Sequence, residues 1–199
     1  EPEELGTVVS ASHACTTLAF DHLEIQHASG TGVTCTPTVL TLRACQDAAC
    51  STPYTGGLAG TLRASGAATV FDNTGNGSGA AFAIPAGQSG TSKGMQVTVA
   101  GSAVVAVNST TVGASGTHLC NFGSPRCTLT AADSGLLLQV PNHVAETSAT
   151  LSVSAVKKAD KGLACVPAFA SVTRNITVGC SYTSPGSGTG RRSSRAASA

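Results

Sequence analysis

The chain has 199 residues, of which 11% are charged and 4% are aromatic, and its formal net charge is +1. A nearly neutral chain lacks the positive field that attracts nucleic acid or an anionic membrane, so we expect neither as a partner. No apolar run approaches the roughly 20 residues of a membrane-spanning helix, and we expect no membrane span. With no tryptophan, the core must be aliphatic.

Alternating runs of β-branched and apolar residues, separated by Gly, Ser, Asn and Pro, predict strands throughout the chain. In chain order, we expect strands at 18–27, 38–44, 58–64, 68–72, 80–85, 95–101, 103–109, 135–141, 149–158 and 172–183. The apolar residues of the first strand do not alternate regularly, which predicts a bulge or bend near Asp21 and His22. Helix signals are nearly absent.

Turn-forming residues gather in 73-NTGNGSG-79 and 86-AGQSGTSKG-94, where positive φ angles are tolerated. The first of these turns follows Asp72 and resembles a calcium loop, because Asp and Asn alternate in it. It lacks the closing glutamate of an EF-hand, so we predict a plain hairpin turn there.

Strands spaced about ten residues apart and joined by such turns are typical of β-sandwich modules. We therefore predict an all-β protein of tandem Ig-like antiparallel β-sandwich modules stapled by disulfides. Residues 1–17 are an extended N-terminal segment, 18–112 the first module, 113–183 the second module, and 184–199 a flexible Gly/Ser/Arg tail.

The chain contains eight cysteines: Cys15, Cys35, Cys45, Cys50, Cys120, Cys127, Cys165 and Cys180. An even number in a lightly charged chain is typical of an oxidising compartment. The opening 1-EPEELGTVVS-10 has neither the basic region nor the apolar core of a signal peptide, so we expect a mature or processed chain. The sequence predicts a secreted or surface-exposed protein.

The motif 45-CQDAAC-50 has three interpretations: a redox pair, half of a metal site, or a staple on a loop. A thioredoxin-like pair needs two intervening residues and a helix, both missing here. A zinc site would need a second pair, for which 120-CNFGSPRC-127 fits loosely, with His118 nearby. We favour local bridges Cys45–Cys50 and Cys120–Cys127. Cys15, Cys35, Cys165 and Cys180 then allow three connectivities.

The sequence offers no arrangement that predicts catalysis. There is no G-x-S-x-G elbow, and the carboxylates are scattered without a pair that sequence can place together. We interpret the histidines, His13, His22, His27, His118 and His143, as exposed loop residues. We therefore expect no enzyme activity, no catalytic residue, no cofactor and no bound metal.

Four phrases occur together in this chain: 20-FDHLEIQHASGTGVTC-35, 39-VLTLRACQDAACSTPYTG-56, 118-HLCNFGSPRCTLTAADSGLLLQVP-141 and 162-GLACVPAFASVTRNITVGCSYTSPGSGTG-190. Their order and spacing resemble the large extracellular region of MshQ-like proteins. These are proteobacterial surface proteins linked to mannose-sensitive haemagglutinin (type IV) pilus loci. The resemblance implies a bacterial chain exported through the periplasm to the cell surface.

The chain departs from this family in two places. The segment 143-HVAETSAT-150 lacks a cysteine that the family usually has, so the partner expected for it, Cys165, must pair elsewhere. The family's region also continues beyond the phrase that ends at Gly190. The resemblance thus implies a second module that is incomplete or completed by another chain, with an open edge and an exposed apolar face.

These features favour a structural or interaction protein that builds or decorates a pilus or filament, with adhesion as a further role. We expect self-association or binding to other surface or pilus proteins, with strand exchange in which 6-GTVVSASHA-14 is the donor as the sharper version of this hypothesis. The alternative is a carbohydrate-binding or ligand-binding module of a secreted adhesin. For a glycan, the only candidate aromatic platforms are Tyr54 and Tyr182.

Overall fold

The computed structural model describes residues 18–142, 148–168, 175–176 and 197–198. Within these residues every regular element is a strand, which confirms the all-β prediction. The strands are β1 (His22–Gln26), β2 (Thr31–Val33), β3 (Thr38–Cys45), β4 (Leu58–Gly66), β5 (Thr69–Phe71), β6 (Ala81–Ile84), β7 (Gly90–Val97), β8 (Gly101–Thr110), β9 (Leu119–Cys120), β10 (Cys127–Ala132), β11 (Ser134–Gln139), β12 (Ser152–Lys158), β13 (Cys165–Pro167), β14 (Asn175–Ile176) and β15 (Ala197–Ser198).

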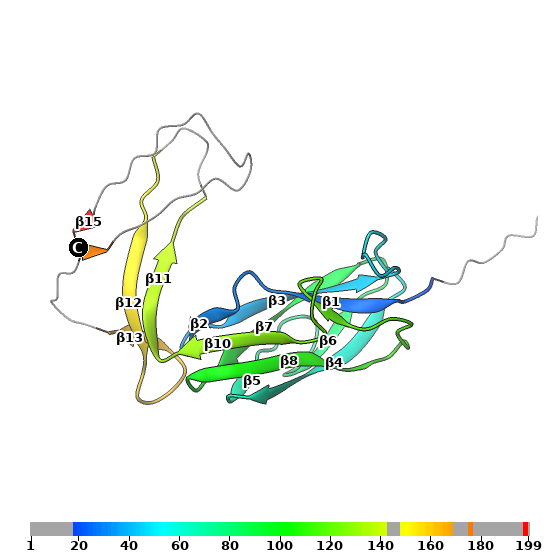
Figure 1. The fold of residues 1–199 in the computed structure, drawn as a ribbon, viewed down its shortest axis with the longest axis horizontal. Coiled ribbons are helices and arrows are strands. Elements are labelled where there is room, and N and C mark those ends of the chain that lie inside the picture. Colours follow the sequence, from blue (N-terminus) through cyan, green and yellow to red (C-terminus); the bar gives the residue numbers. More distant parts are fainter. Residues whose placement is uncertain (1–17, 143–147, 169–174, 177–196, 199) are drawn as a thin grey trace, which may run out of the picture.

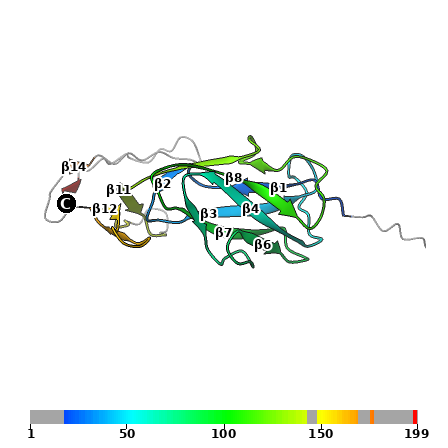
Figure 2. The same ribbon diagram turned by 90° about the horizontal axis from the view of Figure 1, so that it is seen from below.

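Two five-stranded sheets form a sandwich (Figures 1 and 2). One sheet has the order β5-β7-β3-β1-β9 and the other the order β2-β10-β8-β4-β6. The core between them is mainly aliphatic, as the composition requires, with Phe20, Tyr54 and Phe82 as its buried aromatic residues. A third sheet, β11-β12-β13, stands at one end of the sandwich, and β14 pairs with β15.

Strict alternation explains why the central strands form. In β3 the side chains of Leu40, Leu42 and Ala44 are buried, whereas Val39 and Thr41 are exposed. Because successive side chains of a strand point to opposite faces, this pattern places one face in the core and the other outside.

Strand β1 is regular, so the bulge expected near Asp21 and His22 is wrong. Its ladder with β3 is continuous from the His22–Cys45 pair to the Gln26–Thr41 pair. The lack of alternation between apolar and polar residues suggested an irregular strand. Both faces of β1 are in fact buried, because loops cover its outer face, so a regular strand needs no alternation here. The register shift in the sandwich lies in β4, between Thr61 and Leu62.

The expected boundary at residues 112 and 113 differs from the boundary of the sandwich. Strand β10 lies between β2 and β8, parallel to β2 and antiparallel to β8, and β9 runs parallel to β1. The side chains of Cys127, Leu129 and Ala131 enter the core. Residues 119–132 therefore complete the first sandwich because their apolar face closes its core.

The segment between β5 and β6 is not the plain hairpin that the sequence predicted. Strand β5 pairs with β7 in one sheet, and β6 pairs with β4 in the other, so the segment crosses between layers. It wraps around the fully buried side chain of Lys93, whose Nζ donates to the carbonyl oxygens of Thr74 at 2.7 Å and Gly77 at 2.8 Å. An internal ammonium thus occupies the position that the calcium interpretation gave to a metal ion.

Lys93 lies on β7, which begins earlier than expected. The segment 86–94 was predicted as a turn, but the ladder between β3 and β7 already starts at Gly90. Burial lowers the pKa of Lys93, and the nearby carboxylate of Asp72 opposes this shift. The pKa of Asp72 is itself lowered, chiefly by the hydroxyl and amide of Thr74.

The sheet β11-β12-β13 joins the sandwich through one face. This face packs against Val33, the last residue of β2, and against Cys35, two residues further along the chain. Its contacting side chains are Leu137, Val156 and Cys165. Thr34 Oγ1 also donates to Asp133 Oδ1 at 2.9 Å, and Gln96 Nε2 donates to the carbonyl oxygen of Leu163 at 2.9 Å. These contacts form a second, small core at the end of the sandwich.

We predict that Lys93→Met lowers the free energy of unfolding by about 1–3 kcal/mol, because two carbonyl groups in the loop lose their donor. Urea unfolding followed by circular dichroism measures this change. The exposed Lys161 provides the control, since Lys161→Met should leave stability unchanged. Equal stability of the wild type and Lys93→Met would show that the loop does not need the ammonium.

A pair of fragments tests the role of β10. We expect fragment 18–134 to unfold cooperatively on heating, and fragment 18–114 to show no cooperative transition. The shorter fragment loses the buried side chains of Cys127, Leu129 and Ala131 and leaves β8 and β2 without their shared neighbour. Similar melting curves for the two oxidised fragments, recorded by far-ultraviolet circular dichroism, would contradict this assignment.

Candidate functional site

The loop 45–50 is closed by a disulfide between Cys45 and Cys50, whose Cα atoms lie 4.8 Å apart. The carboxylate of Asp47 accepts hydrogen bonds from the amides of Ala49, Ser51 and Thr52 at 2.7–3.1 Å. The amide of Ser51, followed by that of Thr52, holds the pKa of Asp47 well below its usual range. The predicted staple is confirmed, and its loop is further ordered by the Asp47 carboxylate.

The loop 120–127 is closed in the same way, by the predicted bridge Cys120–Cys127, with Cα atoms 5.3 Å apart. Asn121 and Phe122 have φ angles of 46° and 56°, in a region that non-glycine residues seldom adopt. The amide of Phe122 donates to Glu24 Oε1 at 2.6 Å, and its ring is exposed. A buried carboxylate thus holds a strained turn beneath an exposed aromatic ring.

The third disulfide joins Cys35 to Cys165, across 130 positions of the sequence. It fixes β13 to the residues that follow β2 and answers the question of where Cys165 pairs. Cys15 and Cys180, the other two cysteines left open by the sequence, lie outside the described residues, as does Tyr182.

The disulfides also bear on the zinc alternative. One ring nitrogen of His22 and the sulfur atoms of Cys45 and Cys50 lie within 4.8 Å of one another, and His27 lies equally close to Cys120 and Cys127. In the described part of the chain, the two cysteine pairs belong to separate clusters of three ligands. They do not form the single four-ligand site that the zinc interpretation required.

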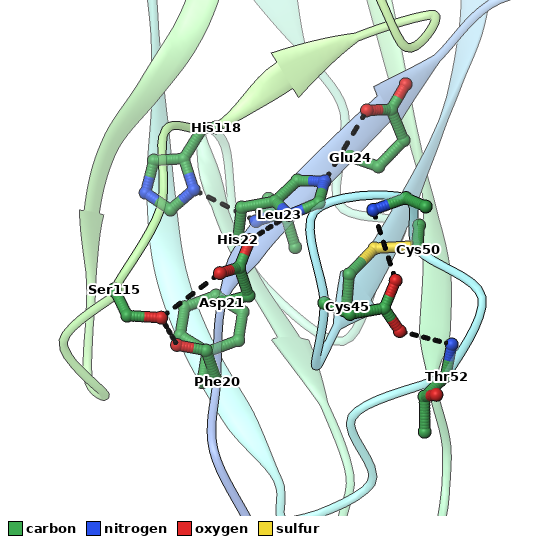
Figure 3. Close-up of polar contacts among 12 residues, drawn as sticks. Phe20, Asp21, His22, Leu23, Glu24, Cys45, Cys50, Thr52, Ser115 and His118 are labelled. Atoms are coloured by element: carbon green, nitrogen blue, oxygen red, sulfur yellow. Dashed lines mark hydrogen bonds and ion pairs between the residues drawn. A yellow bond between two sulfur atoms is a disulfide. The ribbon is translucent and has the colours of Figure 1, made fainter.

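A buried polar cluster lies beside the first of these disulfides (Figure 3). The carboxylate of Asp21 accepts a hydrogen bond from His22 Nδ1 at 2.8 Å. The other ring nitrogen, Nε2, lies 3.9 Å from Glu24 Oε2, and neither atom has a hydrogen-bond partner. Both side chains are almost completely buried, because the two disulfide loops cover this face of β1.

Burial dominates the electrostatics of this cluster. It raises the pKa of Glu24, while the amide of Phe122 and the ring of His22 act in the opposite direction. It lowers the pKa of His118, whose Nδ1 accepts a hydrogen bond from the amide of Leu23 at 2.9 Å. His22 and His118 are therefore not the exposed loop residues that we expected.

The cluster does not have the geometry of a Ser-His-Asp triad. Ser115 Oγ donates to Asp21 Oδ2 at 3.2 Å, whereas a triad needs the serine beside the histidine. The unpaired nitrogen of His22 faces Glu24 instead (Figure 3). The contacts of Glu24 with the amide of Phe122 and of Asp21 with Ser115 tie two loops to β1.

The expected sugar platform at Tyr54 is wrong. Its side chain is buried, and its ring packs against that of Phe20 with centroids 5.3 Å apart. The polar sequence around Tyr54 suggested an exposed loop, but its amide donates to the carbonyl oxygen of Ala44 at 2.9 Å, which holds the residue against β3.

The sheet β11-β12-β13 presents its other face to solvent. On β11, the side chains of Leu136 and Leu138 are 55% and 54% exposed, and Val140 beyond it is 60% exposed. In the ladder with β12, Leu136 lies opposite Ala155 and Leu138 opposite Val153, so these residues share the face. We call the face of Leu136, Leu138, Val153 and Ala155 the open face.

The open face is the strongest candidate for a site of interaction. Large apolar side chains that gather on one exposed surface mark contact sites more often than single exposed residues do. Val153 and Ala155, which share this face with the two leucines, are half-buried. The roles of Glu24 and Lys93 carried no signal in the sequence, because both depend on partners distant in the chain.

Comparison with known families gives two matches. Residues 116–198 match a family described as "Domain of unknown function (DUF6701), first Ig-like domain". That part of the chain is similar to an Ig-like domain. Residues 20–114 match a family described as "Domain of unknown function (DUF8613)". No curated protein matches the chain.

The limit between the two matches falls between β8 and β9, yet the structure pairs β9 and β10 with strands of the first match. The chain is thus an all-β protein in which the Ig-like match begins inside the first sandwich. The three disulfides among the described residues are typical of proteins from oxidising compartments. In the described residues, no helix has the length and apolar character needed to cross a membrane.

We predict that Glu24→Gln raises the free energy of unfolding at pH 7 by about 1 kcal/mol. A neutral amide avoids burying a charge, keeps an oxygen for Phe122 and offers a donor to His22. Because the pKa of Glu24 is raised on folding, the wild type loses stability as pH rises above the ordinary glutamate range, and the variant should lose less.

Urea unfolding at pH 4, 5.5 and 7 measures this difference. Glu24→Ala is the companion variant, and we expect it to be less stable than the wild type at every pH, because the amide of Phe122 loses its acceptor. A Glu24→Gln variant that is destabilised as strongly as Glu24→Ala would mean that the charge itself supports the fold.

Proposed function

We propose that the chain is a structural and interaction protein of the bacterial cell surface that builds or decorates an extracellular appendage such as a pilus or filament. In this proposal it is not an enzyme, and its contacts with other copies or with other surface proteins are its function. Adhesion would follow from the same display at the surface.

The observation that carries this proposal is the open face of the sheet β11-β12-β13. Leu136 and Leu138 stand exposed on a sheet whose opposite face is already used against the sandwich. Covering a face with several large aliphatic side chains stabilises an assembly by about 25 cal/mol per Å² of apolar surface buried. A second copy that packs a sheet against this face would bury them.

Two further observations support an interaction role. The similarity of residues 116–198 to an Ig-like domain agrees with the resemblance of the sequence to MshQ-like surface proteins. Ig-like sandwiches normally have two facing sheets, whereas the described residues after β10 form one sheet of three strands beside the short β14–β15 pair. Strand exchange between copies would add strands at the edges of this sheet.

The buried cluster around His22 supports the view that the chain is not an enzyme. Its serine contacts Asp21 rather than the histidine, and loops cover it. The disulfides support secretion through an oxidising periplasm, where such bonds form.

Mutation of the open face tests the proposal. We expect the full chain to form oligomers or filaments as its concentration rises, and Leu136→Glu/Leu138→Glu to remain monomeric because charges on this face oppose burial. Light scattering after size-exclusion chromatography and negative-stain electron microscopy give the readout. A second variant lacks residues 1–14. If that segment is the donor strand, this variant should not assemble, and unchanged assembly would exclude it as the donor.

Ser152→Glu/Ser154→Glu is the matched control, because these serines lie on the same sheet but on its opposite side and are exposed. It should assemble like the wild type. A wild-type chain that stays monomeric at millimolar concentration would refute the proposal, and equal loss of assembly in the control would remove the open face as its basis.

A further inference from the structure

The outer face of the sheet β2-β10-β8-β4-β6 has an unusual distribution of charge. Its five strands contain no aspartate or glutamate, and Arg63 is their only charged residue. Arg126 immediately precedes β10, at the end of the loop that Cys120–Cys127 closes. Two positive side chains therefore stand on a face whose strands carry no carboxylate to neutralise them.

The register of the strands brings these two arginines to either side of one alanine. Arg63 on β4 lies opposite Ala106 on β8. On the other side of β8, Cys127 lies opposite Val105, so Arg126 reaches the level of Ala106. Neighbouring strands are about 4.8 Å apart, which separates the two arginine backbones by about 10 Å. The short side chain of Ala106 lies between them.

This space is a hollow of about 180 Å³, lined by Arg63, Ala64, Ser65, Val104, Ala106 and Arg126. In the part of the chain that the structure describes, neither guanidinium group forms a hydrogen bond or an ion pair. Such an unneutralised pair of like charges favours an anion between them, because guanidinium groups bind carboxylate and sulfate oxygens with two parallel hydrogen bonds.

Hydroxyl groups continue the site along the next row of the sheet. Ser65 lies opposite Val104, which in turn lies opposite Thr128. Neither hydroxyl has a partner among the described residues. Other hydroxyls on this face bond to each other, such as Ser102 to Thr130 at 2.8 Å. The free polar groups thus gather around the hollow.

We propose that Arg63 and Arg126 form a clamp for the carboxylate or sulfate group of an acidic polysaccharide, whose sugar hydroxyls bond to Ser65 and Thr128. A glycan fits better than a protein partner, because the hollow offers charge and hydroxyl groups but no aromatic or large apolar anchor. The clamp deepens the interaction role proposed above and rests on it only for the location of the chain at a cell surface.

Calorimetric titration of the full chain tests the clamp with three hexasaccharides: one of galacturonate, one sulfated and one of neutral maltose units. We expect the acidic probes to bind and the neutral probe not to bind. Arg63→Gln and Arg126→Gln should each weaken binding by about tenfold or more, because each removes a charged hydrogen-bonding group.

Two control variants distinguish binding in the hollow from non-specific attraction of an anion to positive charge. Ala106→Leu keeps both arginines but fills the hollow, and we expect it to weaken binding as strongly as the loss of one arginine. Lys157→Gln/Lys161→Gln removes two positive charges elsewhere and should bind like the wild type. Equal weakening by this control, or unchanged binding by Ala106→Leu, would overturn the clamp.

Further probes identify the source of the anion. Inorganic sulfate should compete only at much higher concentration than the hexasaccharides, and a short DNA duplex should bind more weakly than they do. The reverse order for either probe would overturn the assignment to a glycan. The arginine variants should assemble like the wild type when measured as for the open face. The glycan-binding proposal and the assembly proposal can therefore fail independently of each other.

Discussion

The placement of β10 between β2 and β8 is the constraint on which the rest of the molecule depends. It closes the core with Leu129 and Ala131 and gives β2 its only sheet neighbour among the described strands. A single residue, Asp133, separates it from β11, so the third sheet must start at this end of the sandwich. At its other end it holds Arg126 beside Ala106. The core, the open face and the clamp all follow from one strand.

Buried polar groups define how the loops settle on this frame. Glu24 fixes the turn at Phe122, and Lys93 fixes the crossover between the sheets, each through backbone groups distant in the sequence. Burying a charged group without a hydrogen-bond partner costs free energy. Movement of either loop away from its buried side chain would break these hydrogen bonds and is therefore opposed. Both groups act as internal anchors in a chain whose small aliphatic core has few large side chains.

Much of the fold was accessible from the sequence where a pattern is local. Alternation identified β3, β4, β8 and β12, and spacing identified the two short disulfides. The alternation of 127-CTLTAA-132 is equally clear, although this segment is not among the predicted strands. The pairing of Cys35 with Cys165 and the approach of Arg63 to Arg126 depend on register between distant strands. No local pattern reports such contacts.

The bond between Cys35 and Cys165 also determines how the protein would carry load. A pull applied between Leu18 and residue 168 passes through 18–35, crosses the disulfide and leaves through 165–168, while the intervening residues lie inside a closed covalent loop. Unfolding under tension therefore cannot release that loop. At about 3.3–3.6 Å per residue, the 130 positions it spans withhold roughly 450 Å of extension. The molecule is built to stay short when it is stretched.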